Sequence, residues 1–326
     1  MTNLTILGRK LAMVPIVGLL AAFCFNAALA LDYPIRPVRL IVGYPASSGP
    51  DLVARLMGSW LSDRLGQSFV IETRPGAGSN IATEAVIRAP PDGYTLLLAS
   101  GSNGFNANLY DRMNFNFLRD IAPVASIYRA PNILVLHPSV PAANTRDFVA
   151  YAKANPGKLN MASNGNGSTG HIYGGLFMNM TGINMVHVPY RDNPLPDLLE
   201  GRTQVHFSPI SSAIDFVKAG KLRALGVTSA TPWAMTPDVP TVAEAVPGFE
   251  AGGWMGVAAP RNTPADIISF LNKEINAVLA EPKFKVSLAA FGGEVFRGSP
   301  SDFGSFMTTY TEKWGKVITQ AGIKLD

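Results

Sequence analysis

Two turns rich in small polar residues follow apolar runs in the two halves of this 326-residue chain. The first has the sequence PASSGPD at residues 45–51, and the second has SNGNGSTGH at residues 163–171. Each turn precedes a segment with helical periodicity, so each is expected to start a helix. The first backbone N–H groups of a helix lack partners within it and carry partial positive charge. The sequence therefore predicts two helix starts that hold an anion without a charged side chain.

Two further polar segments, SGSNG at residues 100–104 and RDN at residues 191–193, also follow strand-like runs. Ligands of open α/β sheets bind at the carboxyl ends of strands, where all four segments are expected. Small polar residues also cap helices without binding any ligand, and this is the alternative interpretation. The candidate ligand-binding residues are Ser47, Ser48, Gly49, Asp51, Ser102, Asn103, Ser163, Asn166, Gly167, Ser168, Thr169, His171 and Arg191.

Three of these candidates carry alternatives of their own. Arg191 is the only one that can make a bidentate contact with a carboxylate, unless it is a solvated surface charge. Asp51 either caps its helix or meets an amine on the solute. His171 falls in the first turn of its helix, where packing or the ligand orients it.

Other chemistries find little support in the residue spacing. The Gly-x-Ser-x-Gly elbow is absent, so a hydrolase would depend on Ser168 and His171 alone. Residues 74–81 lack the third glycine of the dinucleotide fingerprint, and no Gly-Lys-Ser/Thr phosphate loop occurs. The histidines have no metal-ligand spacing, and we interpret His187 and His206 as core residues with satisfied hydrogen bonds. We therefore expect no enzymatic activity, no metal and no cofactor.

The N-terminus is typical of an export signal. Arg9 and Lys10 precede an apolar run that is too short for a membrane span, and an Ala-Leu-Ala sequence predicts cleavage after Ala30. An uncleaved anchor is the alternative. The single cysteine, Cys24, lies inside this leader, so the mature chain has no thiol. Basic and acidic residues, 27 against 23, are scattered along the chain, which argues against a nucleic-acid partner.

Short apolar runs alternate with helical segments along nearly the whole chain, which indicates an α/β fold with largely parallel sheets. The expected strands are residues 38–44, 69–72, 94–100, 124–128, 133–137, 159–162, 186–190, 204–208, 222–228 and 254–258. The expected helices are residues 51–65, 80–89, 145–154, 169–180, 195–200, 213–219, 264–279, 284–291 and 301–321. In the first helix, Leu52, Leu56, Trp60 or Leu61, and Leu65 form the predicted apolar stripe.

The length of the chain predicts two lobes, since a single core rarely covers so many residues. Proline-rich breaks at residues 130–131 and 230–253 mark where the chain leaves the first lobe and returns to it. We expect a signal peptide at residues 1–30, a discontinuous first lobe at residues 31–131 plus 253–326, and a second lobe at residues 132–252.

Eight motifs resemble those of the Bug-type periplasmic solute-binding proteins of tripartite tricarboxylate transporters. They occur in the family's order over nearly all of the mature chain. They are YPIRPVRLIV at 33–42, RPGAGSNIA at 74–82, PDGYTLL at 91–97, ANPGKL at 154–159, HVPY at 187–190, AGKLRAL at 219–225, PDVPTV at 237–242 and KWGKV at 313–317.

The resemblance implies a type II periplasmic binding protein fold: two Rossmann-like lobes with a ligand cleft between them, closing on a carboxylated solute. It implies a monomer in the periplasm that delivers this solute to a membrane permease. A receptor that reports its solute to a membrane sensor is the second hypothesis, and a periplasmic serine hydrolase is the third.

The two turns differ in how well they match the family. The second turn matches its pattern, including His171. The first usually contains consecutive glycines in the family, whereas this chain has Ser47 and Ser48, which add hydroxyl donors and narrow the pocket. After residues 187–190 this chain is a residue or two shorter than the pattern, and Asp192 places a negative charge near the predicted site. These differences argue against transferring a simple di- or tricarboxylate specificity.

Overall fold

The structure, a computed structural model, describes residues 1–2, 32–110, 113–320 and 322–323. Residues 33–326 form the unit considered below. The predicted signal peptide and its cleavage site after Ala30 fall outside the described residues, apart from residues 1–2, so they stay predictions. Among the described helices, none combines the length and the apolar character needed to cross a membrane.

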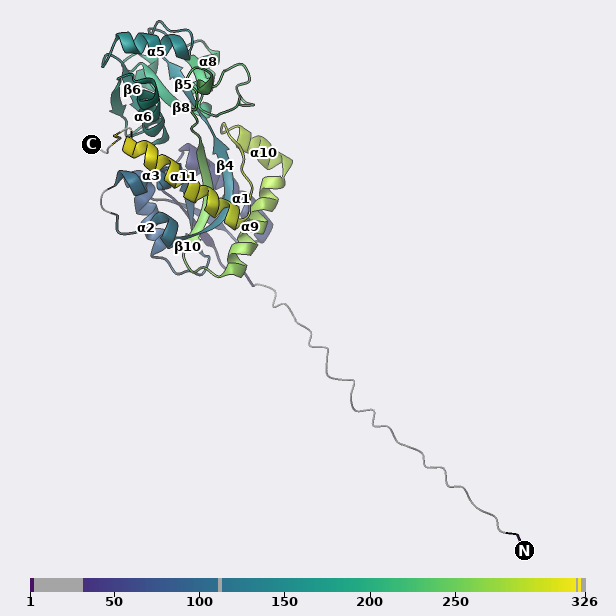
Figure 1. Ribbon diagram of the computed structural model, residues 1–326. Coiled ribbons are helices and arrows are strands. Elements are labelled where there is room, and N and C mark those ends of the chain that lie inside the picture. Colours follow the sequence, from purple (N-terminus) through teal and green to yellow (C-terminus); the bar gives the residue numbers. More distant parts are fainter. Residues whose placement is uncertain (3–31, 111–112, 321, 324–326) are drawn as a thin grey trace. The chain divides into compact units, whose positions relative to one another are not determined.

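The strands form two mixed sheets (Figure 1), ordered β11-β4-β10-β3-β1-β2 and β7-β6-β8-β5-β9. The strands are β1 (Val38–Val42), β2 (Phe69–Thr73), β3 (Thr95–Ser100), β4 (Ile121–Ala130), β5 (Asn132–Leu136), β6 (Asn160–Ser163), β7 (Val186–Pro189), β8 (Val205–Pro209), β9 (Arg223–Val227), β10 (Gly253–Pro260) and β11 (Glu294–Val295). In each sheet the strand next to one edge pairs in parallel with both of its neighbours: β1 with β2 and β3, and β6 with β7 and β8. The two predicted turns therefore follow equivalent strands.

The expectation of largely parallel sheets is wrong. β10 runs antiparallel to β3 and β4, and β5 runs antiparallel to β8 and β9. The reason is the path of the chain between the sheets: β4 leads through Pro131 directly into β5, and β10 returns with Gly253 beside Ala130. The first sheet takes its strands from residues 38–130 and 253–295, and the second takes them from residues 132–227.

Helices cover both sheets, with α5, α6 and α8 around the second and α1, α2 and α9 around the first (Figure 1). The α-helices are α1 (Gly49–Leu65), α2 (Asn80–Ile87), α3 (Gly101–Leu109), α4 (Phe117–Asp120), α5 (Thr145–Ala154), α6 (Thr169–Thr181), α7 (Leu195–Leu199), α8 (Ile210–Lys218), α9 (Ala265–Ala280), α10 (Pro282–Ala289) and α11 (Pro300–Gln320). Two short 3₁₀ turns occupy Ala77–Ser79 and Val242–Glu244.

The buried face of α1 differs from the predicted stripe. Val53, Met57 and Leu61 are the large apolar side chains that α1 buries, whereas Leu52 is 39% exposed. The buried stripe is offset from Leu52 by one residue because α1 packs on β2 and α9 with this face. Of the predicted positions, only the alternative Leu61 lies on it.

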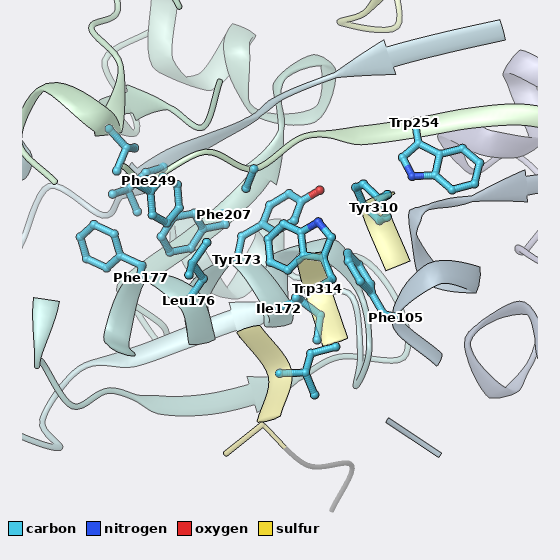
Figure 2. Close-up of a cluster of buried hydrophobic side chains, with 14 of the residues drawn as sticks. Phe105, Ile172, Tyr173, Leu176, Phe177, Phe207, Phe249, Trp254, Tyr310 and Trp314 are labelled. Carbon is cyan, nitrogen blue, oxygen red and sulfur yellow. The ribbon is translucent and has the colours of Figure 1, made fainter. Parts of the chain in front are cut away.

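A hydrophobic core cluster continues from the first sheet to the second (Figure 2). Its middle is formed by Tyr173 on α6, whose ring centroid lies 5.2 Å from that of Trp314 on α11 and 6.4 Å from that of Phe105 on α3. All three side chains are fully buried. The start of α6 is therefore held in place by packing against helices of the first sheet.

Candidate functional site

The second turn leads from the carboxyl end of β6 into the start of α6. Ser168 is the N-cap of α6, and its Oγ accepts the N–H of His171 at 3.4 Å. Gly165 and Gly167 adopt left-handed backbone conformations, with φ of 104° and 76°, which let the chain turn tightly into the helix. Within the described part of the chain, the N–H groups of Thr169 and Gly170, the first two helical residues, have no acceptor. Thr169 is half-buried and Gly170 is buried, and unpaired N–H groups at a helix start are the kind of donors that bind anions.

Two histidines support this turn. Nδ1 of His171 accepts the N–H of Gly167 at 3.1 Å, so this nitrogen carries no proton. The ring of His171 stacks on that of His187 with centroids 3.9 Å apart and planes 1° apart. Burial, and after it His187, lowers the pKa of His171 to about 4. Nε2 of His187 lies 2.7 Å from Oγ of the buried Ser163. His187 is half-buried, so its predicted place in the core is wrong, whereas its predicted hydrogen bonding is confirmed by the contact with Ser163.

The sequence predicts His206 to be a core residue with satisfied hydrogen bonds. Its burial is confirmed, and the predicted hydrogen bonding is wrong. This residue is 1% exposed, but neither ring nitrogen has a partner among the described residues.

The first turn, before α1, is closed by Asp51. One carboxylate oxygen of this buried residue accepts the N–H of Ser47 at 2.8 Å and Nε of Arg55 at 2.9 Å. Ser47 has a φ of 64°, a left-handed conformation that non-glycine residues rarely adopt. The hydroxyl of Ser48 donates to the carbonyl of Pro45 at 2.6 Å. Asp51 thus stabilises the turn before α1, through a residue that precedes the N-cap Ser48 rather than through a helical N–H, so neither alternative for Asp51 is decided.

A third set of polar groups lies at the start of α3, next to β1. The hydroxyl of Tyr44 lies 2.8 Å from Oγ of Ser100 and donates to Oγ of Ser102 at 3.0 Å. The Asn103 amide accepts the N–H of Ser100 at 2.8 Å and donates to Oγ1 of Thr83 at 2.8 Å, so both of its polar groups act within the fold. Sequence reasoning missed Tyr44, although its place directly after β1 was an available signal.

The remaining candidates lie around the second turn. Oγ1 of Thr169 accepts Nδ2 of Asn132 at 3.4 Å, and Asn132 is a further neighbour that sequence reasoning missed. Asn166 is half-buried in the turn itself. Arg191 and Asp192 are exposed beyond the end of β7. The structure thus brings together the residues of each turn, and among the described hydrogen bonds none joins the α1 turn to the α6 turn.

One surface cavity lies away from the candidate residues. A surface cavity of about 810 Å³ lies between α9 and α11, with Ser269 and Thr308 in its wall, and none of the candidate residues lines it. Within the described residues, no group of three or more His, Cys, Asp or Glu side chains is placed to hold a metal ion.

The fold and the site have clear relatives. Residues 53–323 match the model of the tripartite tricarboxylate transporter family receptor. Protein BugT of Bordetella pertussis is 32% identical, with 96% of this chain and 99% of BugT covered. Among solved structures, R. palustris Rpa4515 with adipate is 37% identical with a TM-score of 0.84, covering 90% of this chain and 99% of that one. MatC from Rhodopseudomonas palustris with bound malate is 28% identical with a TM-score of 0.80, covering 88% and 100%.

Two sheets with equivalent strand-turn-helix units and these structural relatives define a type II periplasmic binding protein fold, which confirms the expected fold class. The chain belongs to the tripartite tricarboxylate transporter receptor family, which includes the Bug-type solute-binding proteins. The resemblance seen in its motifs is thereby confirmed.

The site also bears on the hydrolase hypothesis. Among the described contacts, the ring of His171 makes no hydrogen bond with the hydroxyl of Ser168, because its Nδ1 accepts from Gly167 and its face lies against His187. The geometry of a serine activated by this histidine is absent from the described contacts.

Proposed function

We propose that this protein is a periplasmic receptor that captures a small carboxylate at the start of α6 and delivers it to a tripartite tricarboxylate-type permease. The observation that carries the proposal is the pair of N–H groups of Thr169 and Gly170, which have no acceptor among the described residues. Beside them, the hydroxyls of Ser168 and Thr169 offer neutral donors. A carboxylate can accept several such hydrogen bonds at once.

The site suits an anion that must be released again. Neutral donors and a helix start attract negative charge without forming a buried ion pair, whose desolvation costs several kcal/mol. In our proposal Arg191, exposed beyond β7, contacts a second carboxylate at the rim. The first turn, with Ser47 and Ser48, and the Tyr44–Ser102 pair face the other end of the solute.

Dicarboxylates are the substrate class that we propose first. The structure of R. palustris Rpa4515 with adipate and that of MatC with bound malate support this choice. The serines of the first turn and Asp192 lead us to expect a preference that differs in detail from those relatives.

A thermal-shift screen tests the proposal. The purified protein is heated with adipate, malate, a monocarboxylate and a primary amine. A carboxylate at a hundred times its Kd stabilises the folded state by about 2.7 kcal/mol, which corresponds to a rise in Tm of roughly 5–10 °C. The proposal fails if none of the carboxylates raises the Tm.

Matched variants locate the site. Ser168→Ala removes the cap of α6 and should reduce the shift in Tm, and Arg191→Ala should reduce it for dicarboxylates. The control is Asn144→Ala, which removes the cap of α5, where Asn144 accepts the N–H of Asp147 at 2.9 Å. It should lower the Tm of the free protein and preserve the ligand-induced shift. Equal ligand-induced shifts in Tm in Ser168→Ala and Asn144→Ala would show that the start of α6 is not part of the binding site.

We further propose that the receptor acts as a monomer without catalysis. Its two lobes (residues 31–131 plus 253–326, and 132–252) close on the solute. The protein is exported, and its signal peptide is cleaved after Ala30. The intact mass of protein isolated from periplasm tests the cleavage. Capture of permease subunits by the ligand-bound protein tests the transport role, whereas capture of a sensor ectodomain in their place would support the signalling hypothesis.

A further inference from the structure

Three of the four histidines gather beneath the start of α6. His171 is the third residue of α6, and His187 stacks on it from β7. His206 comes from β8, and its Nε2 lies 3.6 Å from the position of a Cβ added at Gly170. The fourth histidine, His137, follows β5 at the opposite end of the strands, where its N–H donates to the carbonyl of Gln204, the residue before β8.

His206 has no hydrogen-bond partner of its own. It is 1% exposed, and both ring nitrogens are unpaired within the described part of the chain. Burial lowers its pKa to about 4, so the ring is neutral near pH 7. A neutral imidazole has one donor and one acceptor nitrogen, and leaving both unpaired in a buried position is unfavourable. Nε2 of this ring therefore lies close to Gly170, at the start of α6, without a hydrogen-bond partner among the described residues.

Few charges surround this ring. No carboxylate contributes to the pKa shift of His206 or of His171. β5, β6 and residues 164–167 carry no ionisable side chain. The other ionisable side chains on the elements packed around it are Tyr173 of α6, His187 of β7, Asp197 of α7, Asp215 and Lys218 of α8, and Tyr190, Arg191 and Asp192 after β7.

None of the carboxylates in that set is placed to hold a proton on His206. Asp197 accepts hydrogen bonds from the hydroxyl of Tyr190 and from Arg202, both at 2.6 Å. Asp192 and Asp215 are exposed. Any stable positive charge on His206 must therefore be balanced by an anion that comes from outside the chain.

We infer that an anion bound at the start of α6 is accompanied by a proton taken up from solvent on Nε2 of His206. The inference rests on the proposed function. Nε2 of His206 lies 3.6 Å from the Cβ position of Gly170, so the charge of an anion on the N–H of Gly170 would act on this ring at short range. A negative charge within about 4–6 Å favours the charged imidazole by about 1–3 pKa units. The proton leaves again when the anion leaves. Binding is then tighter at low pH, and release is favoured as the pH rises.

Calorimetry with adipate tests the inference. Binding enthalpies are measured at pH 5 in buffers of different ionisation enthalpy. The slope of the observed binding enthalpy against the buffer ionisation enthalpy gives the number of protons taken up. We expect wild-type protein to take up on the order of half a proton more than His206→Gln. His137→Gln is the matched control, because this histidine lies away from the cluster, and it should behave as wild type. Protons taken up by adipate itself are the same for all three proteins and cancel.

Affinity supplies a second readout from the same samples. The ratio of adipate affinities at pH 5 and pH 7 should be about two- to fiftyfold larger for wild type than for His206→Gln, for a rise of about 1–3 pKa units. Equal proton uptake and equal ratios in the two proteins would overturn the inference while leaving carboxylate binding intact.

NMR of the wild-type histidine rings covers the case in which His206→Gln fails to fold. In the free protein the imidazole of His206 should stay neutral down to about pH 5. Adipate should raise the midpoint of its NMR titration by about one pH unit or more. A midpoint near 6.5 in the free protein, or one that saturating adipate leaves unchanged, would overturn the inference. If no carboxylate of the thermal-shift screen binds, the proposed function fails, and the free-protein titration still decides whether His206 is buried in its neutral form.

Discussion

Tyr173 and Trp314 lie with ring centroids 5.2 Å apart, although α6 belongs to the second sheet and α11 packs on β4 of the first. Tyr173 is also the fifth residue of the helix whose start offers free N–H groups. This one packing contact therefore ties the proposed anion site to the first sheet. Both rings are fully buried, so removing either one leaves a cavity at the junction of the two sheets.

Truncation of Tyr173 should lower the stability of the protein strongly, whereas removal of its hydroxyl alone should lower it little. Tyr173→Ala deletes a fully buried ring and should lower the free energy of unfolding by about 3–5 kcal/mol. The hydroxyl of Tyr173 interacts with that of Tyr310 but makes no hydrogen bond of ordinary geometry among the described residues, so Tyr173→Phe should change stability by less than about 1.5 kcal/mol. Urea denaturation measures both. If Tyr173→Phe is as unstable as Tyr173→Ala, the hydroxyl of Tyr173 makes a strong stabilising hydrogen bond, which contradicts this prediction.

Asp51 should act through the turn that it closes. Asp51→Ala leaves the N–H of Ser47 without its acceptor and should cost about 1–3 kcal/mol, together with a loss of carboxylate affinity. Asp51→Asn keeps an acceptor oxygen and should be milder in both respects. The amine of the thermal-shift screen should not raise the Tm. An amine that stabilises the wild type but not Asp51→Asn would show instead that this carboxylate meets the solute.

Gly104 makes room for Tyr310 between α3 and α11. A Cβ added there would lie 2.9 Å from Cδ1 of Tyr310, so Gly104→Ala should cost about 1–3 kcal/mol through overpacking. Gly49, in the first turn of α1, has open space around the added Cβ and is the matched control. Gly49→Ala should leave stability within about 0.5 kcal/mol of wild type. Thermal unfolding compares the two, and equal losses would contradict the packing assigned to α3.

The buried histidines should make the free protein sensitive to acid. His171 and His206 have pKa values of about 4 in the folded state against 6.5 for an ordinary histidine. Between these values the unfolded chain binds protons that the folded chain does not, so stability is full above pH 6.5 and falls as the pH decreases toward 4. Each histidine contributes up to about 1.4 kcal/mol per pH unit.

Urea denaturation between pH 7 and pH 4.5, without carboxylates, checks this dependence. His206→Gln should remove one histidine's share of the slope. If the slopes of wild type and His206→Gln coincide, the buried neutral state of His206 is wrong.

The alternation of apolar strands and amphipathic helices was enough to predict most of the fold. Each expected strand and helix is present with ends shifted by a few residues. α3 escaped prediction because its sequence, GSNGFNANL, consists mostly of poor helix formers. Its helix depends on packing, since Phe105 is fully buried and Gly104 admits Tyr310. Such tertiary stabilisation leaves no periodic signal in the sequence.

The candidate site was predictable only where it is local. His171 and Gly167 are four residues apart, so the turn before α6 follows from its own sequence. The stack of His171 on His187 depends on the pairing of β6 with β7, and the contact of Tyr44 with Ser102 depends on the pairing of β1 with β3. These registers are set by the whole sheet, which is why both contacts were missed.

In the proposed function the N–H groups of Thr169 and Gly170 hold a carboxylate. A crystal structure of the protein grown with the acid that raises its Tm most tests this claim directly. We predict a carboxylate oxygen about 2.7–3.2 Å from each of these two nitrogens, with the hydroxyl of Ser168 or Thr169 as a further donor. A carboxylate bound only to exposed Arg191, or in the cavity between α9 and α11, with the start of α6 left empty, would contradict it.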